Sequence, residues 1–153
     1  MRIRRSRRQE RRGVAMVECG FIIPIITMTV LGVIEISRAL EVSQILTAAA
    51  REGGRLGMLR KLSDQEGTMN AKVTADIKHF IAAQGIDPGV VTVEIVDAQV
   101  PGDDPPEVNL DVADRDTYFM VRVSANYEDV SFGVAPVFLD DAVLSGTIRL
   151  RHE

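Results

Sequence analysis

The sequence contains one cysteine, no tryptophan and two histidines, and aromatic residues make up only 5% of its 153 positions. The single cysteine, Cys19, excludes an intrachain disulfide. The two histidines, His79 and His152, lie far apart, and no metal-ligand spacing or nucleophile motif accompanies either of them. We therefore expect no enzyme, no cofactor and no metal centre. His79 is expected on the surface of a helix and His152 in a solvated tail.

Acidic residues are almost missing from the N-terminus. Residues 1–12 hold seven arginines and one acid, Glu10, which gives a net charge of +6; because the whole chain carries −4, the remainder carries −10. A basic arm of this kind is typical of nucleic-acid binding, but no aromatic residue is interleaved to stack on bases. It borders an apolar segment directly, which favours a cytoplasmic membrane flank, since basic residues beside a span stay inside. We expect no nucleic-acid partner.

Charge is then missing from a long apolar run. The 22 residues from Gly13 to Ile34 contain one charged side chain, Glu18. As a helix they measure roughly 33 Å, enough to cross a hydrocarbon core of about 30 Å. The apolar side chains together favour insertion by roughly 4 kcal/mol, and Pro24 is tolerated where its turn is otherwise satisfied. The run predicts a single transmembrane helix.

A secretory signal peptide is the alternative interpretation of a basic region followed by an apolar core, with Ser37-Arg38-Ala39 as its cleavage site. The apolar run exceeds the usual ~7–15 residues of a signal core, and Glu35 and Arg38 place charges where a cleavage site prefers neutral residues. The helical pattern also continues beyond this point.

Residues 35–59 repeat apolar positions at helical spacing, and no proline interrupts them before Gly53-Gly54. The membrane helix is therefore expected to continue into water as one amphipathic rod from about Val14 to Ala50, roughly 55 Å long. Its apolar stripe is most simply the core of an outer domain. The segment AAREGGR lacks the Gly-Lys-Ser/Thr of a phosphate loop, so we expect it to form the exit from the rod.

The remaining chain predicts a second helix over residues 69–89, ended by Gly85 and Pro88. Alternating, β-branched runs predict strands at 90–100, 118–130 and 145–151. A loop or short helix is expected around Pro136. The order of elements indicates an α+β fold, with the long helix packed on a small antiparallel sheet.

The connector at residues 101–116 is rich in proline and aspartate, and carboxylates at this density suggest Ca²⁺. However, Asp111-x-x-Asp114-x-Asp116 lacks the alternate-residue pattern and the glycine of an EF-hand loop. A hydrated loop is favoured, and calcium binding by this stretch, which also includes Asp103 and Asp104, stays open.

The motif RRG followed by VAMVE resembles the cleavage region of type IV pilin-like precursors, in which a basic leader ends in glycine and an apolar helix carries glutamate at its fifth position. More closely, GVAMVECGFIIPIITMTVLGVIEISRAL with QILTAAAREGGRLG resembles the TadE-like family of tight-adherence (Flp) pilus assembly proteins. The resemblance covers residues 11–60 and, more loosely, the final strands at 120–153. Cys19 departs from the family's usual apolar residue at its position.

The resemblance implies a pilin-like fold and a minor pilin or pseudopilin role in a Tad pilus system, with a prepilin peptidase cutting between Gly13 and Val14. It divides the chain into a cytoplasmic leader (1–13), a transmembrane helix (14–36) and a periplasmic α+β domain (37–153) on the bacterial inner membrane. The implied partners are the peptidase, other pilin-like subunits, Tad inner-membrane assembly proteins and membrane lipid. Whether such a chain enters the filament is not decided by its sequence.

Glu18 has a physical role in this scheme. Cleavage would leave an ammonium on Val14, four residues and one helical turn away on the same side. Pairing Glu18 with the ammonium of an adjacent subunit offsets the cost of an intramembrane charge, about 2.5 kcal/mol or more at mid-depth. The alternative is a solvated Glu18 at headgroup level. An alternative for the whole chain is an unprocessed, signal-anchored envelope protein whose outer domain binds a partner.

Overall fold

The chain is described by a computed structural model. The described residues are 6–58, 68–100, 102, 105–114, 116–131, 138–139 and 141–152, with side chains from residue 13 onward.

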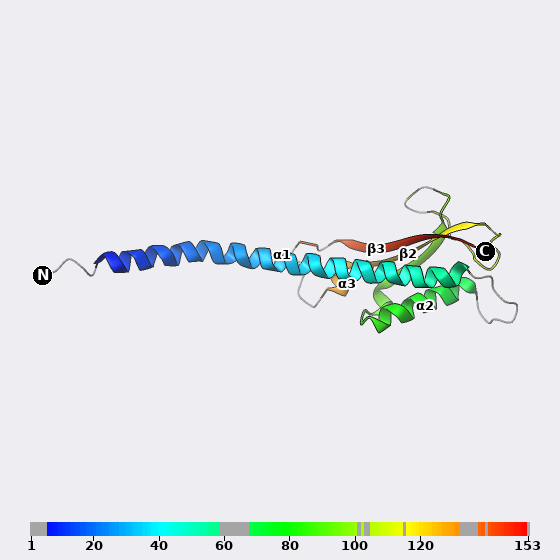
Figure 1. The fold of residues 1–153 in the computed structure, drawn as a ribbon, viewed down its shortest axis with the longest axis horizontal. Helices are drawn as coiled ribbons and strands as arrows, with labels where there is room; N and C mark the ends of the chain where they lie inside the picture. Colours follow the sequence, from blue (N-terminus) through cyan, green and yellow to red (C-terminus); the bar gives the residue numbers. More distant parts are fainter. Residues whose placement is uncertain are drawn as a thin grey trace.

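One helix, α1 (Ser6–Met58), accounts for 53 residues and would measure roughly 80 Å. Figure 1 shows its N-terminal half extending away from the rest of the chain, while the other elements gather around its C-terminal half. The helix is longer than expected at both ends. It begins within the basic leader, and it runs through Gly53-Gly54, so the AAREGGR segment is part of the rod and the expectation that it forms the exit was wrong.

Proline inside α1 leaves one helical carbonyl without its usual donor, because Pro24 has no backbone N–H. The polar side chains nearby are satisfied within the helix. The hydroxyl of Thr27 donates to the Ile23 carbonyl at 2.9 Å, and that of Thr29 donates to the Ile25 carbonyl at 2.8 Å. The apolar half of α1 therefore presents no unbonded hydroxyl group, as a membrane environment requires.

The second helix, α2 (Met69–Ala83), has a defined start and end. Thr68 caps its N-terminus by accepting a hydrogen bond from the Ala71 N–H, and the Asp111 carboxylate accepts from the Met69 N–H at 3.0 Å. Gly85, at φ +79°, ends it, since a left-handed residue suits glycine. The 3-10 turn η1 (Pro88–Val90) leads into the sheet.

Three strands form an antiparallel meander in the order β1-β2-β3: β1 (Val91–Asp97), β2 (Tyr118–Asn126) and β3 (Val143–Arg151). The predicted α+β fold, with a long helix, a second helix and a small antiparallel sheet, is confirmed. The predicted strand at 118–130 is four residues too long, because the short helix α3 (Tyr127–Val130) follows β2. Pro136 lies outside the described residues.

The hydrophobic core lies where α1 passes between α2 and the sheet, and α1 supplies a stripe at helical spacing. Glycines permit close approach on two sides: a Cβ at Gly53 would collide with the Ile77 side chain of α2, and one at Gly54 with Leu150 of β3. Fully buried side chains come from all three layers: Val42, Leu46, Val73, Ile77, Ile81, Phe119, Val121 and Val123.

Candidate assembly site on the exposed helix

The apolar stretch of α1 is exposed over almost its whole length in the part of the chain that the structure describes. No residue from Gly13 to Ile34 is buried; Val14 is 67% exposed and Phe21 is 72% exposed. By length and composition this helix is able to cross a membrane. A core helix of a soluble protein has a comparable composition but is mostly buried, so burial separates the two cases.

The predicted cleavage position, Gly13–Val14, lies within α1. A Cβ built on Gly13 would meet no atom within 4 Å, and the same holds for Gly20, about two helical turns further along α1. Neither glycine is required by packing against the described residues. Glycine in a helix interior costs roughly 1 kcal/mol relative to alanine, so these positions carry a local cost without a packing return.

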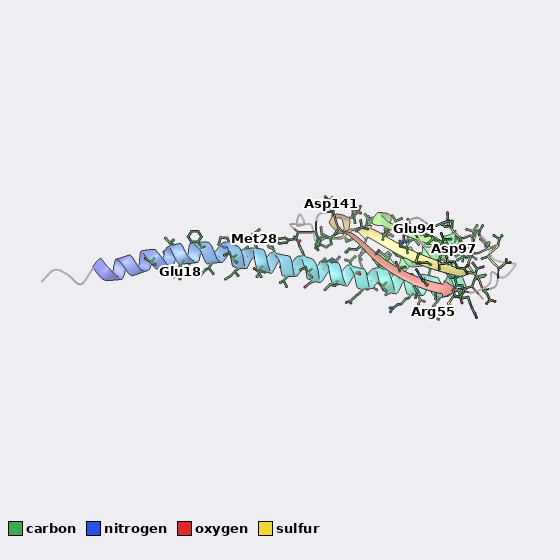
Figure 2. All side chains as sticks on the ribbon, turned by 90° about the horizontal axis from the view of Figure 1, so that it is seen from above. Glu18, Met28, Arg55, Glu94, Asp97 and Asp141 are labelled. Atoms are coloured by element: carbon green, nitrogen blue, oxygen red, sulfur yellow. The ribbon has the colours of Figure 1, made fainter. Side chains whose placement is uncertain are left out.

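Glu18 is exposed on the bare part of the rod, as Figure 2 shows, and lies four residues after Val14. That separation is a rise of about 6 Å along the same side of a helix. Among the side chains described from residue 13 onward, Glu18 makes no hydrogen bond or ion pair. An acid in an apolar span is by default a functional candidate.

A second polar cluster marks the point where the rod enters the domain. Glu35 is 9% exposed, and its carboxylate accepts a hydrogen bond from the Phe138 N–H at 2.9 Å. One turn on, Arg38 donates from Nε to the Val130 carbonyl at 3.2 Å and pairs with Glu41 at 2.9 Å. The first charged side chains after the apolar run are thus used to attach the domain to α1.

Tyr127 completes this cluster from the domain side. Its hydroxyl donates to the backbone carbonyl of Glu35 at 3.2 Å, and the residue is almost fully buried. Burial raises the pKa of Tyr127 above 10.0; the nearby Glu35 carboxylate raises it further, while the Arg38 guanidinium opposes both effects. The hydroxyl is therefore a neutral donor at physiological pH. Sequence periodicity missed this residue because it placed Tyr127 in a strand.

The histidines behave differently from one another. His79 is exposed on α2, as predicted. His152 is 4% exposed, and its Nδ1 lies 3.1 Å from the Gly57 carbonyl of α1, so the expectation of a solvated tail was wrong. The C-terminal end of the described chain is held against the far end of the rod. The backbone of His152 is held as well, since its N–H donates to the Thr117 carbonyl at 2.9 Å and its carbonyl accepts from the Asp116 N–H at 3.0 Å.

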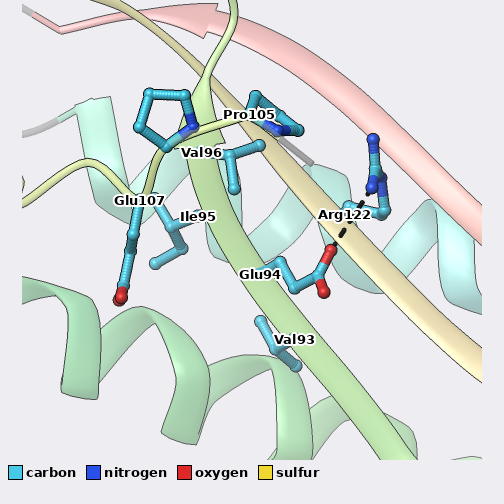
Figure 3. Close-up of a pocket in the computed structure, with 8 residues that line it drawn as sticks. Val93, Glu94, Ile95, Val96, Pro105, Glu107 and Arg122 are labelled. Atoms are coloured by element: carbon cyan, nitrogen blue, oxygen red, sulfur yellow. Dashed lines mark hydrogen bonds and ion pairs between the residues drawn. The ribbon is translucent and has the colours of Figure 1, made fainter. Parts of the chain in front are cut away.

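The outer face of the sheet carries a groove of about 370 Å³ between β1 and the segment at Pro105–Glu107. Figure 3 shows Glu94 and Arg122 directed toward each other in it, with a 3.4 Å ion pair. The connector between β1 and β2 is attached to β1 here. The Asp97 N–H donates to the Pro106 carbonyl at 2.9 Å, and the Val108 N–H donates to the Ile95 carbonyl at 2.9 Å. Its lining holds no histidine, cysteine or hydroxyl nucleophile.

Within the described part of the chain, no group of three or more histidine, cysteine, aspartate or glutamate side chains is placed to hold a metal ion. Asp111 instead caps α2. Asp103 and Asp104 lie outside the described residues, so calcium binding by the connector stays open.

Residues 13–55 match the family model of the TadE-like proteins. This helical segment is TadE-like. The predicted resemblance is confirmed over this range, and the TadE-like segment begins at Gly13, includes Glu18 and ends at Arg55. Neither a curated protein nor a solved structure matches the chain. The looser resemblance at 120–153 lies outside the match and stays a prediction.

The TadE-like segment coincides with most of α1, including its exposed apolar half and its buried stripe. The match covers less than half of the chain and leaves α2 and the three strands outside it. The residues matched are those that place a membrane-compatible helix ahead of a small α+β domain.

Proposed function

We propose that this chain is a minor pilin- or pseudopilin-like subunit of a Tad (Flp) pilus system. It is made as a precursor with a basic leader, and a prepilin peptidase trims it between Gly13 and Val14. It lies in the bacterial inner membrane as a single-pass protein, with residues 1–13 in the cytoplasm and the α+β domain in the periplasm.

The exposed, TadE-like half of α1 is the observation that carries this proposal. The helix has no buried residue from Gly13 to Ile34, its contact with the described domain in this stretch lies at the outer end, where Phe138 meets Gly32, and its C-terminal part is packed in the domain. Such a helix suits lipid before assembly and neighbouring helices after it, because both environments cover the same apolar surface. The arginines of the leader support a cytoplasmic N-terminus, since basic residues are retained on that side.

The glycine at the cleavage position supports recognition by an enzyme. Gly13 has open space around its Cβ position, so packing against the described residues does not require glycine there. A peptidase that binds the backbone in its active site does require glycine, because glycine permits a close approach to the backbone.

Glu18 is assigned the role of an assembly contact. After trimming, the ammonium on Val14 of one subunit pairs with the glutamate of its neighbour, within a low-dielectric surrounding that makes the attraction selective. A charge costs about 2.5–3.5 kcal/mol at the centre of a span and less near the interface, where Glu18 lies, and the pair offsets this cost. It also sets the axial stagger of adjacent helices, because only one relative height brings the two charges together.

Mass spectrometry of the protein purified from cells with and without the prepilin peptidase tests this function. We expect a mature chain starting at Val14 in the first cells and the full chain from Met1 in the second. Gly13→Ser is expected to block trimming, whereas Gly20→Ser, at an equally open helical glycine, is expected to leave it intact.

A chain that starts at Met1 in peptidase-positive, piliated cells would overturn the proposal. It would favour the second candidate, an unprocessed signal-anchored protein whose outer domain binds a partner. The groove beside Glu94 and Arg122 is the observation that keeps this candidate in view.

A further inference from the structure

Phe138 reaches from the domain back along α1 toward the membrane-compatible half of the helix. Its ring packs on the helix at Gly32, where a Cβ would lie 3.4 Å from the ring carbon Cε2. The side chain is nevertheless 56% exposed. The ring thereby extends the exposed apolar surface of α1, and a contiguous apolar patch of this kind marks a contact with a membrane or a partner.

The position of this ring is fixed by backbone contacts. The Phe138 N–H donates to the Glu35 carboxylate, and the Arg38 side chain holds the Val130 carbonyl. Contacts with the domain thus occur at Gly32, Glu35 and Arg38, on successive turns of one side of α1. Phe138 is therefore the part of this attachment that lies furthest toward the N-terminus of the helix.

Phe138 and Leu139 form one wall of an apolar groove of about 680 Å³. The other wall is α1 itself, and no charged side chain lines the groove. The lining residues on α1 are Ile25, Met28, Thr29, Gly32, Val33 and Ile36. The groove is thus continuous with the exposed apolar surface of the predicted span.

Depth along the helix places this groove in the outer leaflet. Gly32 lies 18 residues beyond Val14, a rise of about 27 Å, so a core of about 30 Å that begins near Val14 ends close to Gly32. Glu35 and Arg38 follow within two turns, at the level of the headgroups. Tryptophan and tyrosine are enriched at this depth in membrane proteins, and phenylalanine offers the same kind of apolar ring without their polar group.

We propose that Phe138 and Leu139 are an interfacial anchor that inserts into the outer leaflet, and that phospholipid acyl chains fill the groove beside them. The anchor holds the periplasmic domain against the membrane surface and fixes its rotation about α1. This inference rests on the transmembrane placement of α1 in the proposed function, but not on trimming at Gly13. It concerns the chain before any assembly, when lipid is the neighbour of the apolar surface.

Fluorescence quenching tests the anchor, because the chain has no tryptophan of its own. Phe138→Trp in the full chain provides a single tryptophan, which is excited apart from the two tyrosines at their red edge, in vesicles of phosphatidylethanolamine and phosphatidylglycerol that carry bromine on their acyl chains. We expect the brominated lipid to remove most of the emission and aqueous iodide to remove little. Tyr118→Trp, at a similarly exposed position on the outer face of the sheet, is expected to show the opposite pattern.

Phe21→Trp, in the middle of the span, distinguishes failure of the anchor from failure of the transmembrane placement of α1. If brominated lipid quenches Phe21→Trp but leaves Phe138→Trp to iodide, the anchor is refuted and the transmembrane placement stands. If neither is quenched by brominated lipid, the placement itself is wrong. If Phe138→Trp is protected from iodide only at a high protein-to-lipid ratio and is not quenched by bromine, a second copy of the chain fills the groove. This result would overturn the assignment to lipid.

The role of Glu35 is tested in the Phe138→Trp background. Glu35→Gln keeps a side-chain oxygen that accepts the N–H of residue 138, whereas Glu35→Ala does not. We expect bromine quenching to survive Glu35→Gln and to fall in Glu35→Ala. Equal quenching in both would refute Glu35 as the positioning residue. Labelling Phe138→Cys in a Cys19→Ser chain with an environment-sensitive maleimide repeats the depth measurement without tryptophan, and a water-like emission would contradict the anchor.

Discussion

Gly146 of β3 lies directly against the backbone of α1, and its replacement gives a strong test of the fold. A Cβ at this position would come well inside 3.0 Å of the backbone of Leu46 and Thr47 on α1. No flexible side chain is available to move aside. Strand β3 has little freedom to retreat, because Gly146 pairs with Val123 within nine consecutive residue pairs between β2 and β3.

We expect Gly146→Ala to destabilise the domain by about 3 kcal/mol, at the upper end of the usual cost of overpacking, because the obstacle is backbone on both sides. This corresponds to a loss of roughly 100-fold in the ratio of folded to unfolded chain. Near-ultraviolet circular dichroism during a urea titration in detergent micelles reports it, since both tyrosines, Tyr118 and Tyr127, lie in the domain. The midpoint should fall by roughly 1–3 M.

Two comparison variants make the result specific. Gly57→Ala would meet only side-chain atoms of Leu110 and Phe119, at 3.2 Å, and gains helix propensity, so its effect should stay within about 1 kcal/mol. Thr147→Ala lies on the exposed face of the same strand and should change stability by about 0.5 kcal/mol or less. If Gly146→Ala unfolds at the same midpoint as Thr147→Ala, the direct packing of β3 on the rod is wrong.

The remaining predictions address assembly, pH dependence and the C-terminal contact. Glu18→Ala and Glu18→Gln should insert normally but reduce pilus assembly, whereas Thr27→Ala, exposed in the same span, should not; normal piliation by both glutamate variants would remove the pairing role. Because burial raises the pKa of Tyr127 above 10.0, the unfolded chain ionises first as pH increases, so the urea midpoint should fall above pH 10.0, and Tyr127→Phe should abolish that fall. His152→Ala should cost about 1–3 kcal/mol through its lost contact with a rod carbonyl, and His79→Ala about 0.5 kcal/mol or less; equal effects would contradict the buried position of His152.

Local pattern was sufficient for most of the fold. Hydrophobic periodicity predicted the long helix and α2, and Gly85 marked the end of α2 as expected. Alternation of β-branched residues predicted all three strands to within a few residues. These signals are local, since each depends on residues only a few positions apart.

The errors arose where contacts between distant residues decide the structure. Gly53-Gly54 predicts a break when considered alone, but in the fold each glycine admits a neighbouring element to the helix backbone, and the helix continues to Met58. Tyr127 has strand propensity, yet its hydroxyl meets the Glu35 carbonyl 92 positions earlier in the chain. Sequence spacing contains no signal for either contact.

The candidate site divides in the same way. Gly13, Val14 and Glu18 stand out in the sequence because a lone acid in an apolar run and a glycine after arginines are visible without a fold. The attachment at Glu35 and Arg38 was not visible, because both residues have the appearance of ordinary charges at the end of a span. Their hydrogen bonds to Phe138 and Val130 exist only once the domain has folded back on the rod.

Carbodiimide cross-linking is the most direct test of the central claim, because it joins an amine and a carboxylate only when they are in contact. A membrane-permeant carbodiimide is applied to assembled pili containing equal amounts of ¹⁴N- and ¹⁵N-labelled chain, and linked peptides are identified by mass. The account predicts an amide bond between the Val14 amine of one subunit and the Glu18 carboxylate of its neighbour, and it predicts that this link is lost in Glu18→Gln. Chains that begin at Met1, or a Val14 amine and a Glu18 carboxylate that remain unlinked between subunits, would contradict it.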